Sequence, residues 1–234
     1  MDLTQSMHKA THHLSHDLFG GPRLLKFNWV INFQKGSTFL WVLGLMWYFG
    51  NWSAQGWVYL VLHGSYGILW IIKDQVFPDA KFQAPITLAG GLVAILAVLG
   101  PYWLAPYLLI SPVLGEAHVG ASTGWLVVAG FAYVFGVVLM LGSDAQKFYT
   151  LKFRKELITD GFFKRVRHPN YLGEMMIYGS FALVAWHWLP CLVLAWVWGG
   201  YFSVNIAMKE RSMSRYSEWS EYKAHTNYLI PFIF

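Results

Sequence analysis

The chain has 234 residues, of which 56% are apolar and 18% aromatic, while only 12% are charged, about half the charged share of soluble proteins. With a mean hydropathy of +0.40, this composition excludes a disordered chain, a collagen and a small secreted scaffold, because so much apolar surface must be buried in lipid or in a very large core. A single cysteine, Cys191, excludes a disulfide framework and a cysteine-based metal site. The net charge of +5 is distributed in a way that fits membrane topology better than nucleic-acid binding. We therefore expect membrane lipids, and no nucleic acid, as partners.

Six stretches are candidates for helices that cross a hydrocarbon layer about 30 Å thick, which takes roughly 20 residues. The first is short unless it begins near Asn28, in which case it includes Lys35. The last two are separated only by the corner from His187 to Pro190, which predicts an antiparallel helical hairpin. We predict an all-α, polytopic (multi-pass) membrane helical bundle with about six transmembrane helices. The stretches are residues 37–50, 56–72, 86–104, 124–142, 170–186 and 188–208.

The distribution of Lys and Arg predicts the orientation of these spans. With six spans all 17 basic residues fall on one side: four precede the first span, two lie in 73–85, seven in 143–169 and four after residue 208. The opposite loops, 51–55 and 105–123, contain none. The positive-inside rule then places both termini in the cytoplasm, with the protein in the endoplasmic reticulum of a eukaryote or the inner membrane of a bacterium.

The N-terminal segment, residues 1–36, includes the start of the first helix and is expected to be cytoplasmic. Its histidines are candidate metal ligands, but a solvated tail is the commoner origin of such a pattern. We therefore expect a solvated tail there, and we predict no metal site. The histidines are His8, His12, His13 and His16.

The basic segment 143–169 runs directly into the fifth span through Arg167, His168 and Pro169. A basic loop attracts anionic headgroups, at about 1 kcal/mol per charge, and this accounts for many such residues. It does not explain why polar groups continue into an apolar helix, where they are costly. Pro169 suits the first turn of a helix, whose free N–H groups would favour a phosphate beside Arg167 and His168. Lys81 lies in another loop, so we expect it outside this site.

Further polar groups lie just inside the fifth span and after the sixth. Asn170 and Tyr171 can donate hydrogen bonds, and Glu174 can accept one from a ribose hydroxyl, an ammonium or an amide, unless it pairs with a nearby arginine. Because the two spans form a hairpin, Glu210 returns to the same face as His168. We expect these groups to meet in one cytoplasm-facing pocket.

The stretch from Arg167 to Glu174, RHPNYLGE, resembles the signature shared by membrane sterol reductases, the steroid 5α-reductase group, and the isoprenylcysteine and phospholipid methyltransferases. The residues around it resemble the C-terminal domain of the steroid 5α-reductases in order and spacing, over about residues 142–234. The matching residues are Ser143-Asp144, Gln146-Lys147, Arg154-Lys155, Asp160 to Phe163, and the apolar ending Leu229 to Phe234.

The resemblance implies a cofactor-binding domain at 143–234, with NADPH as the cofactor, and a lipid substrate cavity formed by 37–142. It implies that a Gln-Glu pair and a tyrosine of the second span hold an enone carbonyl and supply its proton. Gln34 matches the glutamine, while Lys35 stands where the glutamate would be. Tyr66 and Tyr171 are the candidate proton donors. The implied cofactor contacts are Asp144, Lys147, Arg154, Arg167, His168, Asn170, Tyr171 and Glu174.

Three hypotheses about the function remain open: two enzyme activities and one role without catalysis. The leading hypothesis is an oxidoreductase of lipid or steroid metabolism that moves a hydride from NADPH to a CH–CH double bond, like a 3-oxo-5α-steroid 4-dehydrogenase. Its steroid, sterol or enoyl lipid would come sideways from the bilayer. The alternative is an S-adenosylmethionine-dependent methyltransferase of isoprenylcysteine or phospholipid, with Glu210 binding the methionine ammonium. The third hypothesis is a catalytically silent lipid-binding protein.

Overall fold

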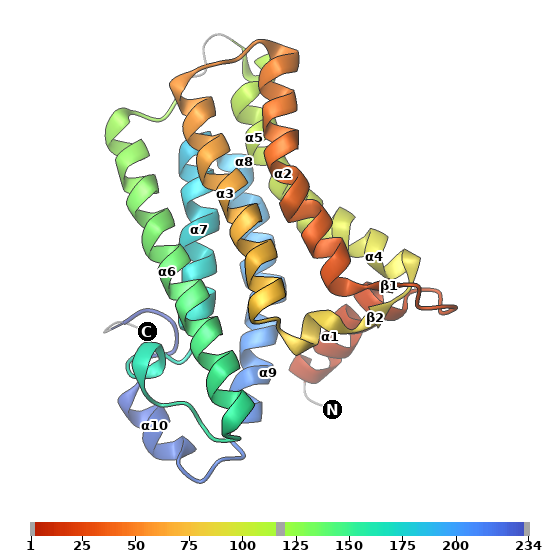
Figure 1. Ribbon diagram of the computed structural model, residues 1–234, viewed down its shortest axis with the longest axis vertical. Coiled ribbons are helices and arrows are strands. Elements are labelled where there is room, and N and C mark those ends of the chain that lie inside the picture. The colour runs from red at the N-terminus through yellow and green to blue at the C-terminus, as the bar shows by residue number, and fades with distance from the viewer. Residues whose placement is uncertain (1–2, 116–119, 232–234) are drawn as a thin grey trace.

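The computed structural model describes residues 3–115 and 120–231, and this part of the chain is mostly helical (Figure 1). The strands β1, Leu25–Lys26, and β2, Pro85–Ile86, form one short antiparallel pair in which Leu25 is opposite Ile86. The α-helices are α1 Leu3–His12, α2 Phe27–Phe49, α3 Ala54–Val76, α4 Leu88–Ala94, α5 Leu104–Ile110, α6 Thr123–Phe153, α7 Pro169–Ala185, α8 Trp188–Trp196, α9 Ser203–Met213 and α10 Trp219–His225.

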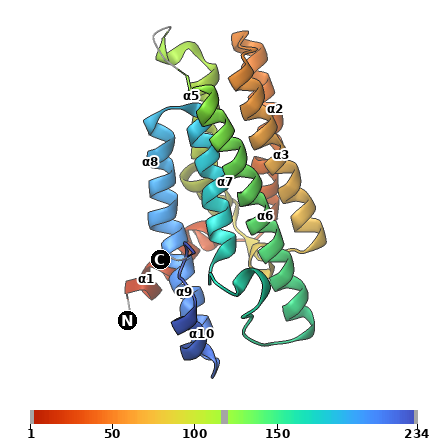
Figure 2. The same ribbon diagram turned by 90° about the vertical axis from the view of Figure 1, so that its left-hand side faces the viewer.

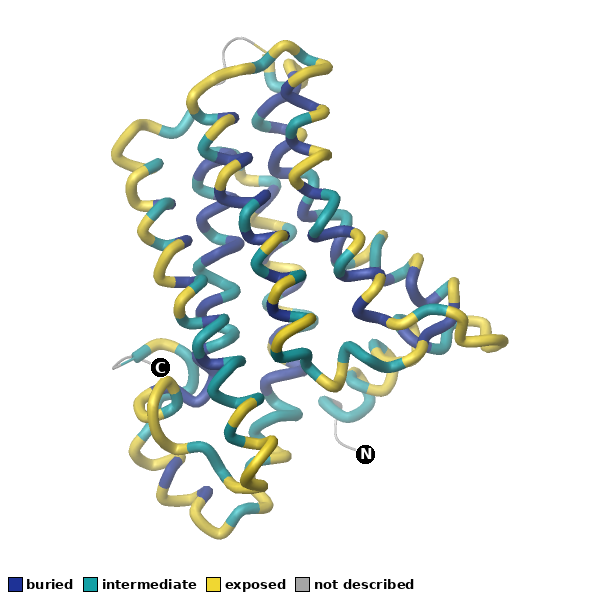
Figure 3. The backbone as a smooth tube through the Cα atoms, in the orientation of Figure 1, coloured by how far each residue is buried: buried dark blue, intermediate teal, exposed yellow. Residues whose placement is uncertain are grey.

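The long helices α2, α3, α6 and α7 run side by side, and α8 continues into α9 along a further face of the bundle (Figures 1 and 2). Three helical stretches are long and apolar enough to cross a membrane: Leu88–Ile110, Thr123–Phe153 and Trp188–Met213. The outward side of α6 exposes apolar residues such as Phe131 and Phe135, whereas the faces that meet in the middle of the bundle are buried (Figure 3). The chain is therefore a membrane protein whose helices contact lipid.

Two of these three stretches are not regular α-helix throughout. A π-turn, Ile95–Leu99, and a 3₁₀ turn, Gly100–Trp103, connect α4 with α5. Another π-turn, Val197–Phe202, connects α8 with α9. Helices do form at the predicted stretches, but the predicted boundaries were only approximate.

The other three predicted stretches are also helical. Helix α2 begins at Phe27, well before residue 37, so that Lys35 lies within it and is buried. Helix α3 holds the buried Lys73 in its last turn. Helix α7 begins at Pro169, and the corner at His187 turns the chain back into α8, which confirms the predicted hairpin.

The expectation that residues 143–169 form a polar loop is wrong for residues 143–153, because α6 continues through them to Phe153. The residues there, including Gln146 and Lys147, are good helix formers, and a polar end of a helix can extend into water. The turn that follows docks back on α6. The Gln146 amide donates to the Asp160 carboxylate (2.9 Å) and accepts from the Phe162 N–H (3.0 Å).

The expectation of a solvated N-terminal tail is also wrong. Helix α1 contacts α9, and the π-turn that follows it, His13–Asp17, packs against α4. His16 is only 5% exposed, and its ring centroid lies 4.9 Å from that of Phe27. The Thr87 N–H donates to the His16 carbonyl (2.9 Å). The segment is a packed part of the protein, and within residues 3–115 and 120–231 no cluster of side chains is arranged to hold a metal.

Glycines allow two helix pairs to approach closely. A Cβ atom at Gly67 of α3 would overlap the carbonyl oxygen of Lys35 on α2. A Cβ atom at Gly173 of α7 would lie 2.6 Å from the carbonyl oxygen of Gly136 on α6. In both cases the obstacle is backbone, which cannot rotate away as a side chain can. The position of Lys35 in the bundle therefore depends on the absence of a side chain at Gly67.

We expect Gly67→Ala to destabilise the protein by about 1–3 kcal/mol, because α3 must move away from α2. Gly44→Ala is the matched control, since Gly44 lies in α2 with nothing within 4 Å of its missing Cβ. The control should be neutral or slightly stabilising, because alanine favours helix. Thermal unfolding in detergent checks both variants, and equal midpoints would contradict the close approach.

Candidate functional site

A cavity of about 340 Å³ lies within the bundle, between α1, α2, α3, α7 and the two stretches that contain π-turns. One part of its wall is apolar and includes Val93, Ala97, Val98 and Val197. The other part is strongly polar. Its charged groups include Lys35, Lys73, Lys81, Lys209, Asp144 and Glu174. The cavity thus joins charged and apolar surfaces, as a site for an amphiphilic ligand requires.

Helix α7 presents one polar face to this cavity. Pro169 starts the helix, as the sequence predicted, and the next residues on that face follow at helical spacing: Asn170, Tyr171, Glu174 and Tyr178. The structure thus brings three predicted site residues together in the cavity wall. Tyr178 was missed, although its spacing of four residues from Glu174 was the available signal. Among the described residues Glu174 forms no ion pair, so the expected alternative of a pair with an arginine is not observed.

Lys35 of α2 lies at the junction of three helices. Its Nζ donates to the hydroxyl oxygens of Tyr66 on α3 (2.8 Å) and Tyr178 on α7 (2.6 Å), and it lies 4.0 Å from the centroid of the Trp70 ring. Lys35 is 4% exposed and lines the cavity. Its neighbour Gln34, one of the three predicted catalytic residues, is buried outside the lining, and its amide nitrogen has no hydrogen-bond partner among the described residues. Tyr66 is fully buried and is connected to the cavity through Lys35.

The predicted cofactor contacts on α6 are held by ion pairs. Asp144 lines the cavity and pairs with Lys73 of α3 at 3.0 Å. Lys147 lies one turn further, outside the lining, and pairs at 3.3 Å with Asp79, which does line the cavity. Burial alone would raise the pKa of Asp79, but Lys147 and the other nearby cations outweigh it and lower that pKa to about 2. Asp79 is therefore ionised at neutral pH and fixes Lys147.

Two further cations reach the cavity from other segments. Lys81, expected to lie outside the site, lines the cavity and donates to the Asn205 side-chain oxygen of α9. The expectation is wrong because the loop after α3 folds against α9, where Lys81, although an exposed residue, reaches Asn205. Lys209 of α9 lies 4.5 Å from the centroid of the Tyr171 ring. The charged part of the wall therefore combines α2, α3, α6, α7, α9 and the loop that contains Lys81.

Arg167, His168 and Glu210 form a separate cluster. The Glu210 carboxylate is 3.0 Å from Arg167 Nε and 2.8 Å from His168 Nε2, so the two polar segments meet as predicted. Arg167 also donates to the carbonyl oxygens of Lys223 and Thr226. None of the three lines the cavity. In this arrangement they hold the C-terminal segment against the start of α7.

The C-terminal segment itself is described as far as Pro231, so the last part of the apolar ending, residues 232–234, lies outside the described residues. The Arg167 N–H donates to the Asn227 carbonyl (3.0 Å), and the Asn227 N–H donates to the Arg165 carbonyl (2.9 Å). Tyr228 lies beside Arg167, with its ring centroid 5.6 Å from the guanidinium carbon. Backbone and side chain together fasten this segment to the bundle.

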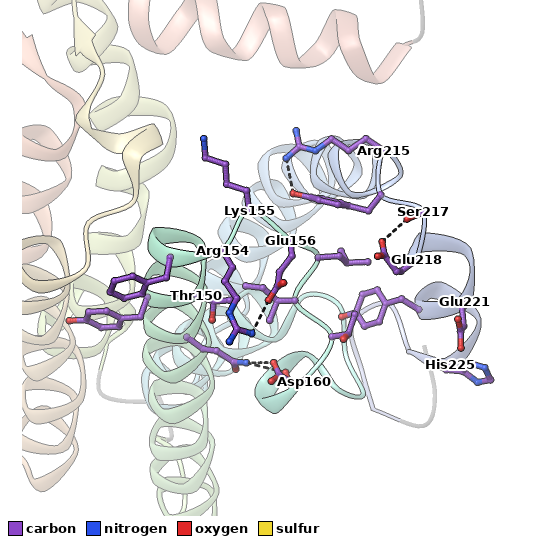
Figure 4. A pocket seen from close by; sticks show the side chains of 18 residues that line it. Thr150, Arg154, Lys155, Glu156, Asp160, Arg215, Ser217, Glu218, Glu221 and His225 are labelled. Atoms are coloured by element: carbon purple, nitrogen blue, oxygen red, sulfur yellow. Dashed lines mark hydrogen bonds and ion pairs between the residues drawn. The ribbon is translucent and has the colours of Figure 1, made fainter.

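Arg154, the remaining predicted cofactor contact, lies in a surface cleft of about 1360 Å³ (Figure 4). The cleft is formed by the end of α6, residues 154–160 and residues 215–225, and it shares no lining residue with the cavity. Arg154 pairs with Glu156 at 3.5 Å. The structure therefore does not bring Arg154 together with the α7 residues.

We expect Arg167→Ala to destabilise the C-terminal segment by about 1–3 kcal/mol, because it leaves two carbonyl groups without this donor and leaves Glu210 with His168 alone. Limited proteolysis should then cleave between residues 219 and 231 sooner than in the unchanged protein. Lys164→Ala is the control, since Lys164 is exposed in the same basic segment. Equal cleavage rates in the two variants would contradict the fastening role.

Comparison with known proteins shows which family the chain is related to. A model of the family DUF1295, described as proteins of unknown function, matches residues 19–228. An uncharacterized protein of Schizosaccharomyces pombe is 33% identical over 82 residues, which is 33% of this chain and 27% of that protein. The chain thus matches well under half the length of this relative. The family model, in contrast, extends from the turn after α1 almost to the end of the described residues, and the chain belongs to the DUF1295 family.

Proposed function

We propose that this protein is a membrane-embedded, NADPH-dependent reductase of a carbon–carbon double bond in a lipid. The observation that carries the proposal is the cavity wall, in which Asn170, Tyr171 and Glu174 of the RHPNYLGE motif share one lining with a region that contains four lysines and with an apolar region. A dinucleotide needs the first region, and a lipid needs the second. The shared cavity would bring the two reactants into contact.

The polar residues fit NADPH by their chemistry. The Asn170 amide and the Glu174 carboxylate line the cavity, and no hydrogen bond or ion pair to another described residue engages either side chain. They can bind the carboxamide or ribose hydroxyls of a nicotinamide nucleotide. Lys81 and Lys209 are suited to its phosphates. When bound, NADPH would supply the hydride.

The apolar wall supports a lipid as the second reactant. It is formed by α4, α8 and the π-turns that follow them, which belong to stretches able to cross a membrane. As part of the proposal, α2, α3 and α7 also cross, which gives six spans with both termini in the cytoplasm. The lipid would come sideways from the bilayer, in the endoplasmic reticulum of a eukaryote or the inner membrane of a bacterium. An apolar wall also excludes water from the reacting atoms.

One observation favours the reductase over the methyltransferase alternative. The methyltransferase hypothesis assigns the methionine ammonium to Glu210, but Arg167 and His168 bind this carboxylate, and it does not line the cavity. Asp144 is likewise paired with Lys73. An incoming ammonium would also meet Lys81 and Lys209, whose charge opposes it. The cationic wall suits a phosphate better than a sulfonium compound.

We expect NADPH, and not S-adenosylmethionine, to raise the thermal midpoint of the purified protein in detergent. A ligand present at a hundred times its dissociation constant stabilises the folded state by about 2.7 kcal/mol. The reverse result would support the methyltransferase. Stabilisation by neither compound would favour a lipid-binding protein without catalysis.

We expect Asn170→Ala and Lys81→Ala each to weaken NADPH binding by about tenfold or more, because each removes a polar contact in a partly desolvated site, worth on the order of 1–3 kcal/mol. Lys164→Ala should leave NADPH binding unchanged, since Lys164 is an exposed residue of the basic segment 143–169 and lines neither the cavity nor the surface cleft. Titration calorimetry with NADPH checks the three variants. Equal, small losses would mean that the basic groups bind membrane headgroups instead.

A further inference from the structure

We propose that α1 and the π-turn after it, residues 3–17, form a lid over the opening through which a lipid enters the cavity from the bilayer. This inference rests on the proposed function in one respect, that the ligand is a lipid, and it identifies the entrance and the segment that controls it. The family model begins at residue 19. The lid therefore precedes the matched part of the chain, whereas the walls that it covers lie within that part.

The exposed residues of the cavity lining show where the cavity reaches the surface. Of the described lining residues five are exposed, and four of these are apolar. The four belong to the lid and to the stretches Leu88–Ile110 and Trp188–Met213, which are both able to cross a membrane. An apolar rim between two such stretches suits the hydrocarbon part of a lipid. The four are Met7, Leu14, Ala97 and Trp196, and the fifth exposed residue is Lys81.

The lid lies between these two stretches, because α1 contacts α9 and the π-turn packs against α4 (Figure 1). Thr87 holds the turn in place: its N–H donates to the His16 carbonyl (2.9 Å) and its hydroxyl donates to the Leu18 carbonyl (3.2 Å). The backbone of the turn is also close to α4, since a Cβ atom at Gly90 would lie 2.7 Å from the carbonyl oxygen of Ser15. The turn is therefore the attached end of the lid.

The polar side chains that the lid contributes to the cavity are bonded within the lid itself. The Thr11 hydroxyl donates to the Met7 carbonyl (3.0 Å), and the Ser15 hydroxyl donates to the Thr11 carbonyl (2.8 Å). Among the described residues, neither hydroxyl is bonded to the opposite wall of the cavity. The other two lining residues of the lid, Met7 and Leu14, are apolar. Moving α1 aside therefore breaks no hydrogen bond across the cavity.

Two hydrogen bonds connect opposite sides of the opening. With its amide oriented to accept, the Gln5 side-chain oxygen of α1 lies 2.8 Å from Nη1 of Arg211 on α9. The Trp196 indole of α8 donates to the Ala97 carbonyl oxygen (3.0 Å), which joins the two membrane-crossing stretches directly. Trp196, Ala97 and Arg211 are all exposed, so each bond can be exchanged for bonds to other groups when the opening widens.

The test measures how fast a cysteine inside the cavity reacts, so it requires no known ligand. Ala94→Cys places a thiol at a lining position that is 3% exposed, and Cys191→Ser removes the exposed native cysteine. The protein is held in lipid nanodiscs. A lipid-soluble maleimide with a hydrocarbon chain and a sulfonated maleimide that cannot enter the bilayer are compared. Each rate is divided by the rate of the same variant after unfolding.

Two substitutions at Gln5 should change the rate of the lipid-soluble maleimide in opposite directions. Gln5→Glu gains an ion pair with Arg211 and should slow the reaction by about two- to fivefold, whereas Gln5→Arg is repelled and should speed it by a similar factor. Trp196→Phe removes the indole donor and should also speed the reaction. Trp188→Phe is the matched control, because Trp188 is an exposed tryptophan of the same helix that does not line the cavity.

The inference is overturned if both Gln5 substitutions leave the rate unchanged or shift it in the same direction. It is also overturned if they change the rate of the sulfonated maleimide as strongly, because the opening would then face water. If a Gln5 variant does not fold, Trp196→Phe beside Trp188→Phe decides the question. The proposed function fails separately. If NADPH does not bind while the cysteine responds to Gln5 as expected, the lid stands and the reductase assignment does not.

Discussion

A charged side chain that is removed from water in the interior of a membrane protein needs a partner. This requirement determines how the helices of the bundle are placed relative to one another. Lys73 reaches from α3 to Asp144 on α6, and Lys35 reaches from α2 to hydroxyl oxygens on both α3 and α7. These contacts connect α2, α3, α6 and α7, four of the helices around the polar part of the cavity. The ion pair between Lys147 and Asp79 adds the loop after α3. Lys35, Lys73 and Asp144 therefore both line the cavity and set the positions of the helices, so the site and the fold share these groups.

The sequence predicts best where chemistry and local geometry coincide. Pro169 fixes the start of α7, and helical spacing then places Asn170 and Glu174 on one face, so this part of the site could be found without a structure. The hairpin followed from the short corner at His187. The roles of Lys35 and Lys81 could not be found in this way. Each depends on a contact with a residue more than thirty positions away along the chain, to Tyr66 or to Asn205, and no local pattern encodes such pairings.

Arg167 and α1 show two other limits of sequence analysis. An arginine at the start of a helix can bind a phosphate or a carboxylate with the same guanidinium. The hairpin predicts that Glu210 lies on the same face, but only the structure shows that the Glu210 carboxylate pairs with Arg167 at 3.0 Å. A ten-residue helix such as α1 is marginal alone in water. Its stability comes from contacts with α9 and from the π-turn that anchors it beside α4. Because of these contacts, a segment whose composition is typical of a solvated tail forms part of the cavity wall, to which Met7 and Thr11 belong.

The two π-turns set the apolar wall of the cavity apart from its polar wall. Ile95–Leu99 and Val197–Phe202 both contribute lining residues, and in a π-turn the hydrogen bonds span one residue more than in an α-helix. The polar lining residues on α2, α3 and α7 belong instead to regular α-helices, which Lys35 connects. Selectivity in such a cavity would come from the polar groups, whose spacing these contacts fix, because the apolar wall offers the rest of a ligand contact area without directional bonds.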